Sequence, residues 1–373
     1  MKNLLITIML LCGFSFSQIK LEGPPSPKLN NANVKQQIVS GMLDATMSDI
    51  ATHHTQAAWV LYIEPVVVGP RMICCSDNWS GDHARCCNSC SLESRNHNSF
   101  DTDDSACMTS GPPTHLFVLV RVESGAVQKV RAYTPDCALD AGGLDVIMLD
   151  GVKPAESVAW LEKQILQSVS NDSGTPRGIM DGALQSLALH ADVSADNALE
   201  RLLQPVQPTI NSQRKLREQT AFWISQTRGH KGFLLLQHFA RNDGDDRFRE
   251  QLTFPISQSN DPEALTELVR MARSDANKRV RGQAIFWLSQ KAGHKAAEAI
   301  SDALENDPET DVKKKAVFAL SQLPRDESVP LLIKYAGSSR NPSVRKEAIF
   351  WLGQSGDPRA LDFLEQLVTG PSH

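Results

Sequence analysis

The sequence predicts a protein in two parts: an α-helical solenoid in the C-terminal half, preceded by a small α+β domain held by disulfides. Three observations support this fold class. A segment recurs at a constant interval in the C-terminal half, cysteines cluster in the N-terminal half, and an apolar leader begins at Met1. The chain has 373 residues, enough for two domains, and its apolar share of 41% is ordinary for a globular protein.

The recurring segment ends in glutamine and reads AFWISQ, TFPISQ, IFWLSQ, VFALSQ and IFWLGQ in its five copies. The closing glutamines are Gln226, Gln258, Gln290, Gln322 and Gln354, which are equally spaced along the chain. Equal spacing without insertions is typical of an array, because each unit must match the length of the neighbour on which it stacks. We therefore expect a solenoid over 173–373.

Apolar residues inside each unit follow a helical period. Val280, Ala284 and Leu288 lie at i, i+4 and i+8, and a second amphipathic run at 264–272 follows the turn-forming residues 260–262. Each unit therefore contains two predicted helices. An earlier copy at 179–203 is the expected N-terminal cap, giving about six helix pairs, and Pro255 is expected to distort its helix or end it early.

Three of the copies resemble the second helix of HEAT repeats: VRGQAIFWLSQ from Val280, VKKKAVFALSQ from Val312 and VRKEAIFWLGQ from Val344. The resemblance covers about half of the chain, and the whole arrangement resembles exported bacterial HEAT-repeat proteins with a cysteine-rich N-terminal domain. It implies that the second helices line a concave surface. HEAT-like enzymes such as deoxyhypusine hydroxylase hold iron through His-Glu dipeptides, and this chain has no such dipeptide. We expect no metal and no cofactor.

A charged ladder recurs with the repeat. Its cationic position holds Arg217, Arg249, Arg281, Lys313 and Arg345, and Asp243, Asp275 and Asp307 lie six residues before three of them. The resemblance implies that the matching Asp and Arg side chains bridge neighbouring units. We interpret the ladder as structural, and the tryptophans at positions 223, 287 and 351 as core residues, because they fall at the i+7 core phase.

A row of phenylalanines breaks the helical pattern in register. Its members are Phe222, Phe254, Phe286, Phe318 and Phe350. At about 100° per residue, Phe286 points roughly 150° away from the apolar face of its helix, toward the polar side that carries the glutamine. The predicted partner-binding stripe consists of this row with Gln226, Gln290, Gln322 and Gln354. It suits an extended peptide or a partner helix; packing between adjacent second helices is the alternative.

The segment from Met1 to Ser17 has the pattern of a secretory signal peptide. Lys2 precedes an apolar run from Leu4 to Cys12, and Ser15 and Ser17 form a small-residue cleavage pattern before Gln18. The run is too short for a bilayer span, which needs about 20 residues, and Leu11 argues against lipidation of Cys12. We therefore expect a periplasmic or extracellular protein with no transmembrane segment.

Residues 18–172 predict the α+β domain. A helix is expected over 31–51, strands over 58–68, 115–123, 127–133 and 144–149, and a proline-initiated helix over 154–169. The strands at 115–123 and 127–133 flank Ser124 and Gly125, which is a hairpin signal. A long loop at 75–114, rich in Cys, Ser, Asn and Asp, needs function or covalent staples to hold it.

All seven cysteines that remain after cleavage lie in this domain. They are Cys74, Cys75, Cys86, Cys87, Cys90, Cys107 and Cys137. In an exported chain such a cluster is normally a disulfide framework, and the odd count leaves one cysteine over. The alternative is a tetrahedral zinc site built around the CxxC of Cys87 and Cys90.

An enzymatic site is the alternative to a scaffold. Cys137, with Asp136 and Asp140 beside it, could act in thiol-dependent or hydrolytic chemistry if the fold brought His115 or His83 near as a base. A bridged cysteine is the simpler interpretation in an oxidising compartment. The acidic run 101–104 lacks the glycine and terminal glutamate of an EF-hand loop, so we interpret it as solvated.

Charge argues against nucleic acid as the partner. Residues 18–210 carry 13 basic and 22 acidic side chains, and residues 211–373 carry 24 and 21, so neither part has a concentrated basic footprint. The function predicted from the sequence is therefore that of an exported, non-catalytic scaffold. Its solenoid would bind a protein or peptide through the concave face.

Overall fold

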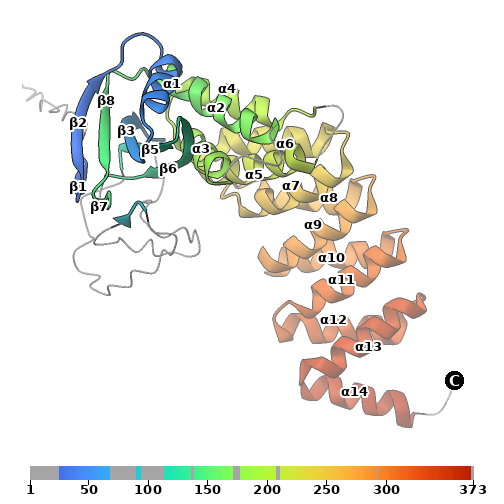
Figure 1. Ribbon diagram of the computed structural model, residues 1–373. Helices are drawn as coiled ribbons and strands as arrows, with labels where there is room; N and C mark the ends of the chain where they lie inside the picture. Colours follow the sequence, from blue (N-terminus) through green and yellow to red (C-terminus); the bar gives the residue numbers. More distant parts are fainter. Residues whose placement is uncertain are drawn as a thin grey trace, which may run out of the picture.

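The computed structural model describes residues 25–67, 90–93, 113–135, 138–170, 177–206, 211–291 and 293–370. Figure 1 shows a sheet region at one end of the molecule and a stack of helices that extends away from it. The predicted leader, six of the seven cysteines and the acidic run at 101–104 lie outside these residues. No helix in the described ranges has the length and apolar character needed to cross a membrane.

The N-terminal part is built on a mixed five-stranded sheet. Its strand order is β2 (Asn33–Ile38), β8 (Asp145–Asp150), β3 (Ala58–Pro65), β5 (His115–Glu123) and β6 (Ala126–Tyr133). β8 runs parallel to β2 and β3, whereas β5 is antiparallel to β3 and β6. A small parallel sheet, β1 (Lys28–Asn30), β7 (Ala138–Asp140) and β4 (Cys90–Ser91), continues beside it.

The predicted hairpin is confirmed. β5 and β6 pair around Ser124 and Gly125, whose positive φ angles of 53° and 80° suit a two-residue hairpin turn. The strands expected at 58–68, 115–123 and 144–149 match β3, β5 and β8 within three residues at each end. Their central residues are apolar and fully buried, as expected for strands covered on both faces.

The helix expected over 31–51 is wrong in its first half. Residues 33–38 form strand β2, and α1 covers only Leu43–His53. β2 pairs with β8 along its whole length, and Lys35 Nζ lies 2.6 Å from Asp145 Oδ2. Gly41, with φ of 92°, separates strand from helix. Pairing with a distant strand overrides the local helical pattern here.

The helical part contains α2 to α14. Their bounds are α2 Pro154–Ser170, α3 Arg177–Leu189, α4 Val193–Leu203, α5 Asn211–Thr227, α6 Gly229–Asn242, α7 Asp246–Gln258, α8 Ala264–Ser274, α9 Lys278–Lys291, α10 Gly293–Asn306, α11 Thr310–Ser321, α12 Arg325–Ser338, α13 Pro342–Ser355 and α14 Pro358–Thr369. Each even-numbered helix up to α12 packs against the odd-numbered helix that follows it. The described residues thus hold six helix pairs, of which the first is α2 with α3, followed by α14.

Pro255 does not end its helix. α7 continues to Gln258 with Pro255 inside it. The proline lies in the last turn, where the loss of its main-chain N–H removes one hydrogen bond and the helix is about to end. The last carbonyl oxygens of any helix lack partners within the helix and need others. Lys291 supplies such a partner, because its ammonium donates to the carbonyl oxygens of Ser257 and Ser259. The neighbouring unit therefore caps the helix that the proline was expected to break.

The helices join the sheet through a close contact between α3 and β6. A Cβ atom on Gly182 would lie 1.8 Å from the carbonyl oxygen of Val130, so only glycine permits this approach. Beyond α3, Val67 N donates to Leu189 O and Ala191 N donates to Pro65 O, each at 2.9 Å. The segment after β3 is thus tied to the α3–α4 turn.

A buried contact between a histidine and a glutamate completes this junction. His190 Nε2 lies 3.2 Å from Glu64 Oε2, and both side chains are at most 1% exposed. His190 Nδ1 accepts a hydrogen bond from Asp192 N at 3.1 Å, which assigns the ring proton to Nε2, facing the carboxylate. On the helical face of the sheet, Ser157 Oγ of α2 donates to Tyr62 Oη at 3.2 Å, and burial raises the pKa of Tyr62.

The Asp–Arg ladder bridges neighbouring units, as expected. Arg249 donates through Nε and Nη2 to the carboxylate of Asp275, at 3.1 Å each, and Arg281 donates to Asp307 at 2.6 and 3.1 Å. Arg217 donates to Asp243 through Nη2 alone, and its Nε donates to the carbonyl oxygen of Leu203. These six side chains are at most 11% exposed, and hydrogen bonding to Asp307 raises the pKa of Arg281.

Each of these arginines also holds the turn of its own unit. Arg281 Nη1 donates to Asp275 O at 2.9 Å, and Arg345 Nη1 makes the equivalent contact with Ser339 O at 2.7 Å. Lys313 departs from the pattern. Its ammonium donates to Glu305 O at 3.0 Å, and the next unit carries Ser339 where an aspartate would complete the rung.

We expect Arg281→Ala to lower the free energy of unfolding by about 3 kcal/mol, because it leaves the buried Asp307 carboxylate without its cation. Lys313→Ala is the matched control at the same position of the next unit. It removes only a contact with a carbonyl oxygen and should cost less than about 1 kcal/mol. Chemical denaturation of both variants measures the difference, and equal midpoints would contradict a structural ladder.

Candidate functional site

The odd-numbered helices from α5 to α13 form the inner layer of the array. Each contacts the next odd-numbered helix more extensively than the even-numbered helices contact one another. The phenylalanine row lies on this layer.

None of the five phenylalanines is in the core. Phe222, Phe254, Phe286 and Phe318 are partly buried, and Phe350 is 54% exposed. By contrast, Ile285 and Leu288 of the same helix as Phe286 are fully buried. The off-phase position inferred from the sequence is therefore the position that the rings occupy.

The rings form a continuous aromatic ladder along the inner layer. Phe222 stacks on Phe254 and Phe286 on Phe318, with centroid distances of 6.0 and 6.3 Å and interplanar angles of 2° and 5°. The tryptophans close the remaining gaps. Trp287 lies 4.9 Å from Phe254 and 5.0 Å from Phe286, and Trp351 lies 5.2 Å from Phe318 and 5.1 Å from Phe350.

The interpretation of the tryptophans as packing residues is confirmed, because all three rings pack against the core. Trp223, Trp287 and Trp351 are partly buried and belong to the aromatic ladder. The i+7 position lies at the edge of the apolar face, where the next helix leaves part of a large ring uncovered. Trp287 Nε1 is buried without a hydrogen-bond partner. Trp351 Nε1 donates to Glu347 Oε1 at 3.1 Å.

The glutamines lie beside the aromatic ladder at the ends of the same helices. In four units Gln Nε2 donates to the preceding serine Oγ at 3.1 to 3.4 Å, and that serine donates to the phenylalanine carbonyl oxygen. The fifth unit has Gly353 in place of the serine, and Gln354 is exposed. Each relay fixes the amide beside its ring, and the glutamine carbonyl oxygen remains able to accept a further hydrogen bond.

Charge changes along the ladder. The residue four positions before each phenylalanine shares its helix face. This position holds Glu218, Glu250, Gly282, Lys314 and Lys346 in chain order. Glu250 pairs with Arg279 at 3.0 Å, whereas Lys314 and Lys346 are exposed. The face is therefore acidic at the α5 end and basic at the α13 end.

Little of the alternative site around Cys137 lies within the described residues. Cys137 and Asp136 fall outside them. Asp140 Oδ1 accepts from Gly142 N at 2.8 Å and Oδ2 accepts from Asn31 Nδ2 at 2.9 Å, which is the arrangement of a turn. His115 lies next to Thr114, with Nδ1 2.9 Å from Thr114 Oγ1, and burial lowers its pKa.

Cys90 is the only cysteine within the described ranges. It is 1% exposed at the start of β4. The other six cysteines of the predicted disulfide framework lie outside the described residues. Where side chains are described, no group of three or more His, Cys, Asp or Glu could hold a metal ion. His230 is exposed and lies 2.6 Å from Asp261 in a turn.

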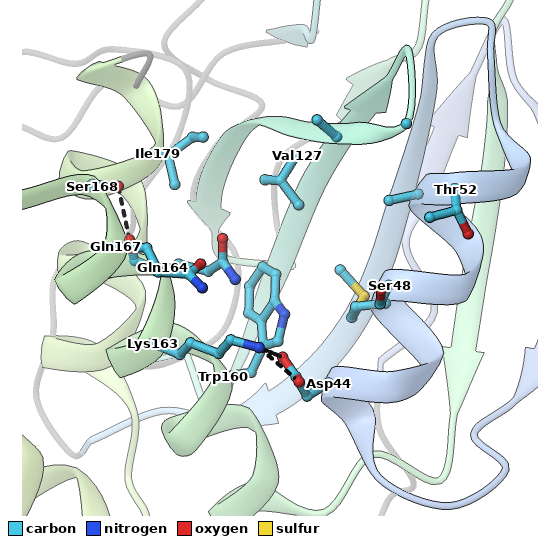
Figure 2. A pocket seen from close by; sticks show the side chains of 14 residues that line it. Asp44, Ser48, Thr52, Val127, Trp160, Lys163, Gln164, Gln167, Ser168 and Ile179 are labelled. Carbon is cyan, nitrogen blue, oxygen red and sulfur yellow. Dashed lines mark hydrogen bonds and ion pairs between the residues drawn. The ribbon is translucent and has the colours of Figure 1, made fainter. Parts of the chain in front are cut away.

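A pocket that the sequence did not predict lies between α1, α2 and the β5–β6 turn (Figure 2). It has a volume of about 360 Å³, and Trp160, Met47 and Val127 supply its apolar wall. Lys163 pairs with Asp44 across one side at 2.7 Å. The pairing of α1 with α2 is set by tertiary packing, so no local pattern indicates this pocket. It shares no residue with the aromatic ladder.

A family model of HEAT repeats matches residues 297–373. These residues cover most of α10 and all of α11 to α14. The C-terminal part of the chain consists of HEAT repeats. Among curated proteins, none matches this chain.

Solved structures of several kinds are similar to the chain. Human deoxyhypusine hydroxylase in complex with glycerol is 16% identical over 59% of this chain and 92% of its own, with a TM-score of 0.26. The CpcE–CpcF complex of phycocyanin lyase from Nostoc sp. PCC7120 is 21% identical over 43% and 99%, with a TM-score of 0.32. Kap121p bound to Pho4p is 13% identical over 58% and 27%, with a TM-score of 0.32.

We expect the double variant Phe286→Ser, Phe318→Ser to fold, with a loss of about 1 to 2 kcal/mol per ring, because only part of each ring is buried. Phe248→Ala is the control. That ring is fully buried beneath Arg217, 3.7 Å from the guanidinium carbon, and its loss should cost about 3 to 5 kcal/mol.

Thermal or chemical denaturation of the two variants decides between a surface row and a core row. The double variant is expected to match Phe248→Ala only if the row packs the array. An equal loss of unfolding free energy per phenylalanine would therefore show that the row is not a binding surface.

Proposed function

We propose that the chain is a non-catalytic scaffold whose HEAT array binds a protein or peptide along the aromatic ladder of the inner layer. HEAT arrays typically bind proteins. The observation that carries the proposal is the unbroken run of rings from Phe222 to Phe350, none of which is fully buried. A row of partly exposed aromatic rings is costly for a surface that only faces water.

The chemistry of the ladder indicates the kind of segment it would bind. Stacked rings offer flat apolar contact area, and the glutamine amides beside them can hydrogen-bond to an extended main chain. The basic α13 end, with Lys314 and Lys346 exposed, favours carboxylates on the partner at that end. The partner is therefore an extended or helical segment with apolar side chains and an acidic end.

Export is part of the proposal. Its support is the leader pattern of Met1 to Ser17 and the clustering of every remaining cysteine in the N-terminal domain. The N-terminal domain would then add a second, covalently stapled surface to the scaffold.

Partner binding is tested by capture with three forms of the protein from its native envelope. The wild type and Leu234→Ser, a control that alters an exposed leucine on the outer helix α6, should retain the same partner. The double variant Phe286→Ser, Phe318→Ser should lose it by at least about tenfold, as expected when central aromatic anchors are removed. Mass spectrometry of the captured proteins gives the result, and equal capture by all three forms would refute the ladder as the binding surface.

The cysteine framework has its own test. Protein recovered from its native compartment should begin at Gln18 and carry three disulfides and one free thiol, since seven cysteines remain. Alkylation with and without reduction, followed by mass spectrometry, counts them. Seven free thiols, or one zinc ion per chain, would overturn both the framework and the case for export.

A further inference from the structure

The glutamines beside the aromatic ladder keep hydrogen-bonding groups that a partner could use. An amide side chain has two N–H donors and one carbonyl acceptor. The serine relay uses one N–H, as in the 3.4 Å bond from Gln290 to Ser289. The second N–H and the carbonyl oxygen have no partner among the described residues, and both Gln290 and Gln322 are exposed. The ladder thus offers a donor and an acceptor in each unit.

These free amide groups favour an extended partner over a helical one. In an α-helix the main-chain N–H and C=O groups bond to one another except in the first and last turns. A helix lying along the ladder would therefore leave most of the glutamine amides without a main-chain partner. An extended segment keeps its main-chain groups available along its edges, so it can pair with an amide in each unit.

The spacing of the rings also fits an extended chain. The centroids of Phe222 and Phe254 lie 6.0 Å apart, and those of Phe286 and Phe318 lie 6.3 Å apart. Two residues of a β-strand advance about 6.6 Å and place their side chains on the same face. One turn of a polyproline II helix advances about 9.3 Å, which is too long for these pairs. A β-strand therefore sets one side chain against each ring of a stacked pair.

Three exposed lysines lie on the half of the ladder from α9 to α13. Lys314 and Lys346 each lie four residues before the phenylalanine of their helix. The side chain of Lys315 reaches back over Gly282, where a Cβ atom would lie 2.6 Å from Lys315 Cδ and 3.1 Å from its Nζ. The glycine therefore makes room for this lysine beside the ladder. None of the three lysines forms an ion pair with a described residue.

The carboxylates near the ladder do not neutralise these lysines. Glu218 lies at the opposite, α5 end, where burial raises the pKa of its carboxyl group. Glu250 pairs with Arg279 at 3.0 Å, and Glu347 accepts a hydrogen bond from a tryptophan N–H at 3.1 Å. The half from α9 to α13 thus presents positive charge to a partner, and carboxylates on that partner would complement it.

We propose that the ladder binds an extended acidic segment as a β-strand, with two residues per unit and its carboxylates near Lys315, Lys314 and Lys346. This inference rests on the proposed function, because it specifies the partner of the same surface. Alternate residues of the segment are apolar and face the rings. The intervening residues carry the carboxylates, within reach of the long lysine side chains at the flank. Five units then bind about ten residues.

Fluorescence anisotropy with labelled synthetic peptides and the full chain tests the proposal. The probe has about ten residues and alternates leucine with polar residues, which are glutamate in one half and serine in the other. One control peptide replaces glutamate with glutamine, a second has the same residues without alternation, and a third is a stapled helix with its leucines on one face. The probe should bind at least about tenfold more tightly than each control, because only it matches spacing, amides and charge.

Variants of the chain separate the charged contact from the amide contact. Lys314→Gln with Lys346→Gln should weaken the probe by at least about tenfold and make its binding less sensitive to salt, without affecting the glutamine peptide. Gln290→Leu with Gln322→Leu should weaken both peptides by the same factor. Lys231→Gln, at an exposed lysine of the outer helix α6, is the control and should bind as the wild type does. Equal circular dichroism spectra establish that all variants are folded.

The outcomes distinguish this inference from the proposed function. A stapled helix or a glutamine peptide that binds as tightly as the probe overturns the inference, as does a probe that fails to bind at about 1 mM. If Phe286→Ser with Phe318→Ser nevertheless loses the native partner, the ladder is still a binding surface, but for another kind of segment. If that double variant retains the native partner, the proposed function fails and this inference fails with it.

Discussion

The buried pairing of an arginine in one repeat with an aspartate in the next is the constraint on which the array depends. Each arginine, as Arg281 shows, holds the carboxylate of the following unit and the turn carbonyl of its own. A buried guanidinium is tolerated only when its donors are satisfied in fixed directions. An insertion in either unit would displace the carboxylate, so the pairing requires units of strictly equal length.

The aromatic ladder follows from the same constraint. Because the rungs fix both the rise and the rotation between units, side chains at equivalent positions come into register along the inner layer. Phe286 can then stack on Phe318 at nearly parallel planes, although neither ring is held by the core. Where the ladder of charges stops, at Lys313 and Ser339, the aromatic row continues to Phe350 through Trp351. The remaining units are held by apolar packing such as that of Val344 and Leu352.

The repetitive half of the protein could be predicted from its sequence because its contacts are local and repeated. The helix pairs and the off-core position of Phe286 follow from periodicity, and the bridging of units by Asp and Arg follows from the resemblance to HEAT repeats. The failures occur where distant segments meet. Residues 33–38 have a helical pattern but pair with β8 as a strand. Pro255 is tolerated because it lies in the last turn of its helix, and the pocket at Trp160 requires α1 and α2 to meet. The tryptophans pack against the core, as the sequence predicts, and each also contacts the aromatic ladder.

The glycine at the sheet contact affects how the two halves could have evolved. Since any side chain on Gly182 would collide with the main chain of Val130, the first helix pair is fitted to this particular sheet. Units in the middle of the array can be duplicated or lost without touching that fit, because each meets only its neighbours. Recombination that moved the array onto another N-terminal domain would need a matching strand and a glycine opposite it. The array can therefore change length at its C-terminal end. Its N-terminal end is fitted to one N-terminal domain.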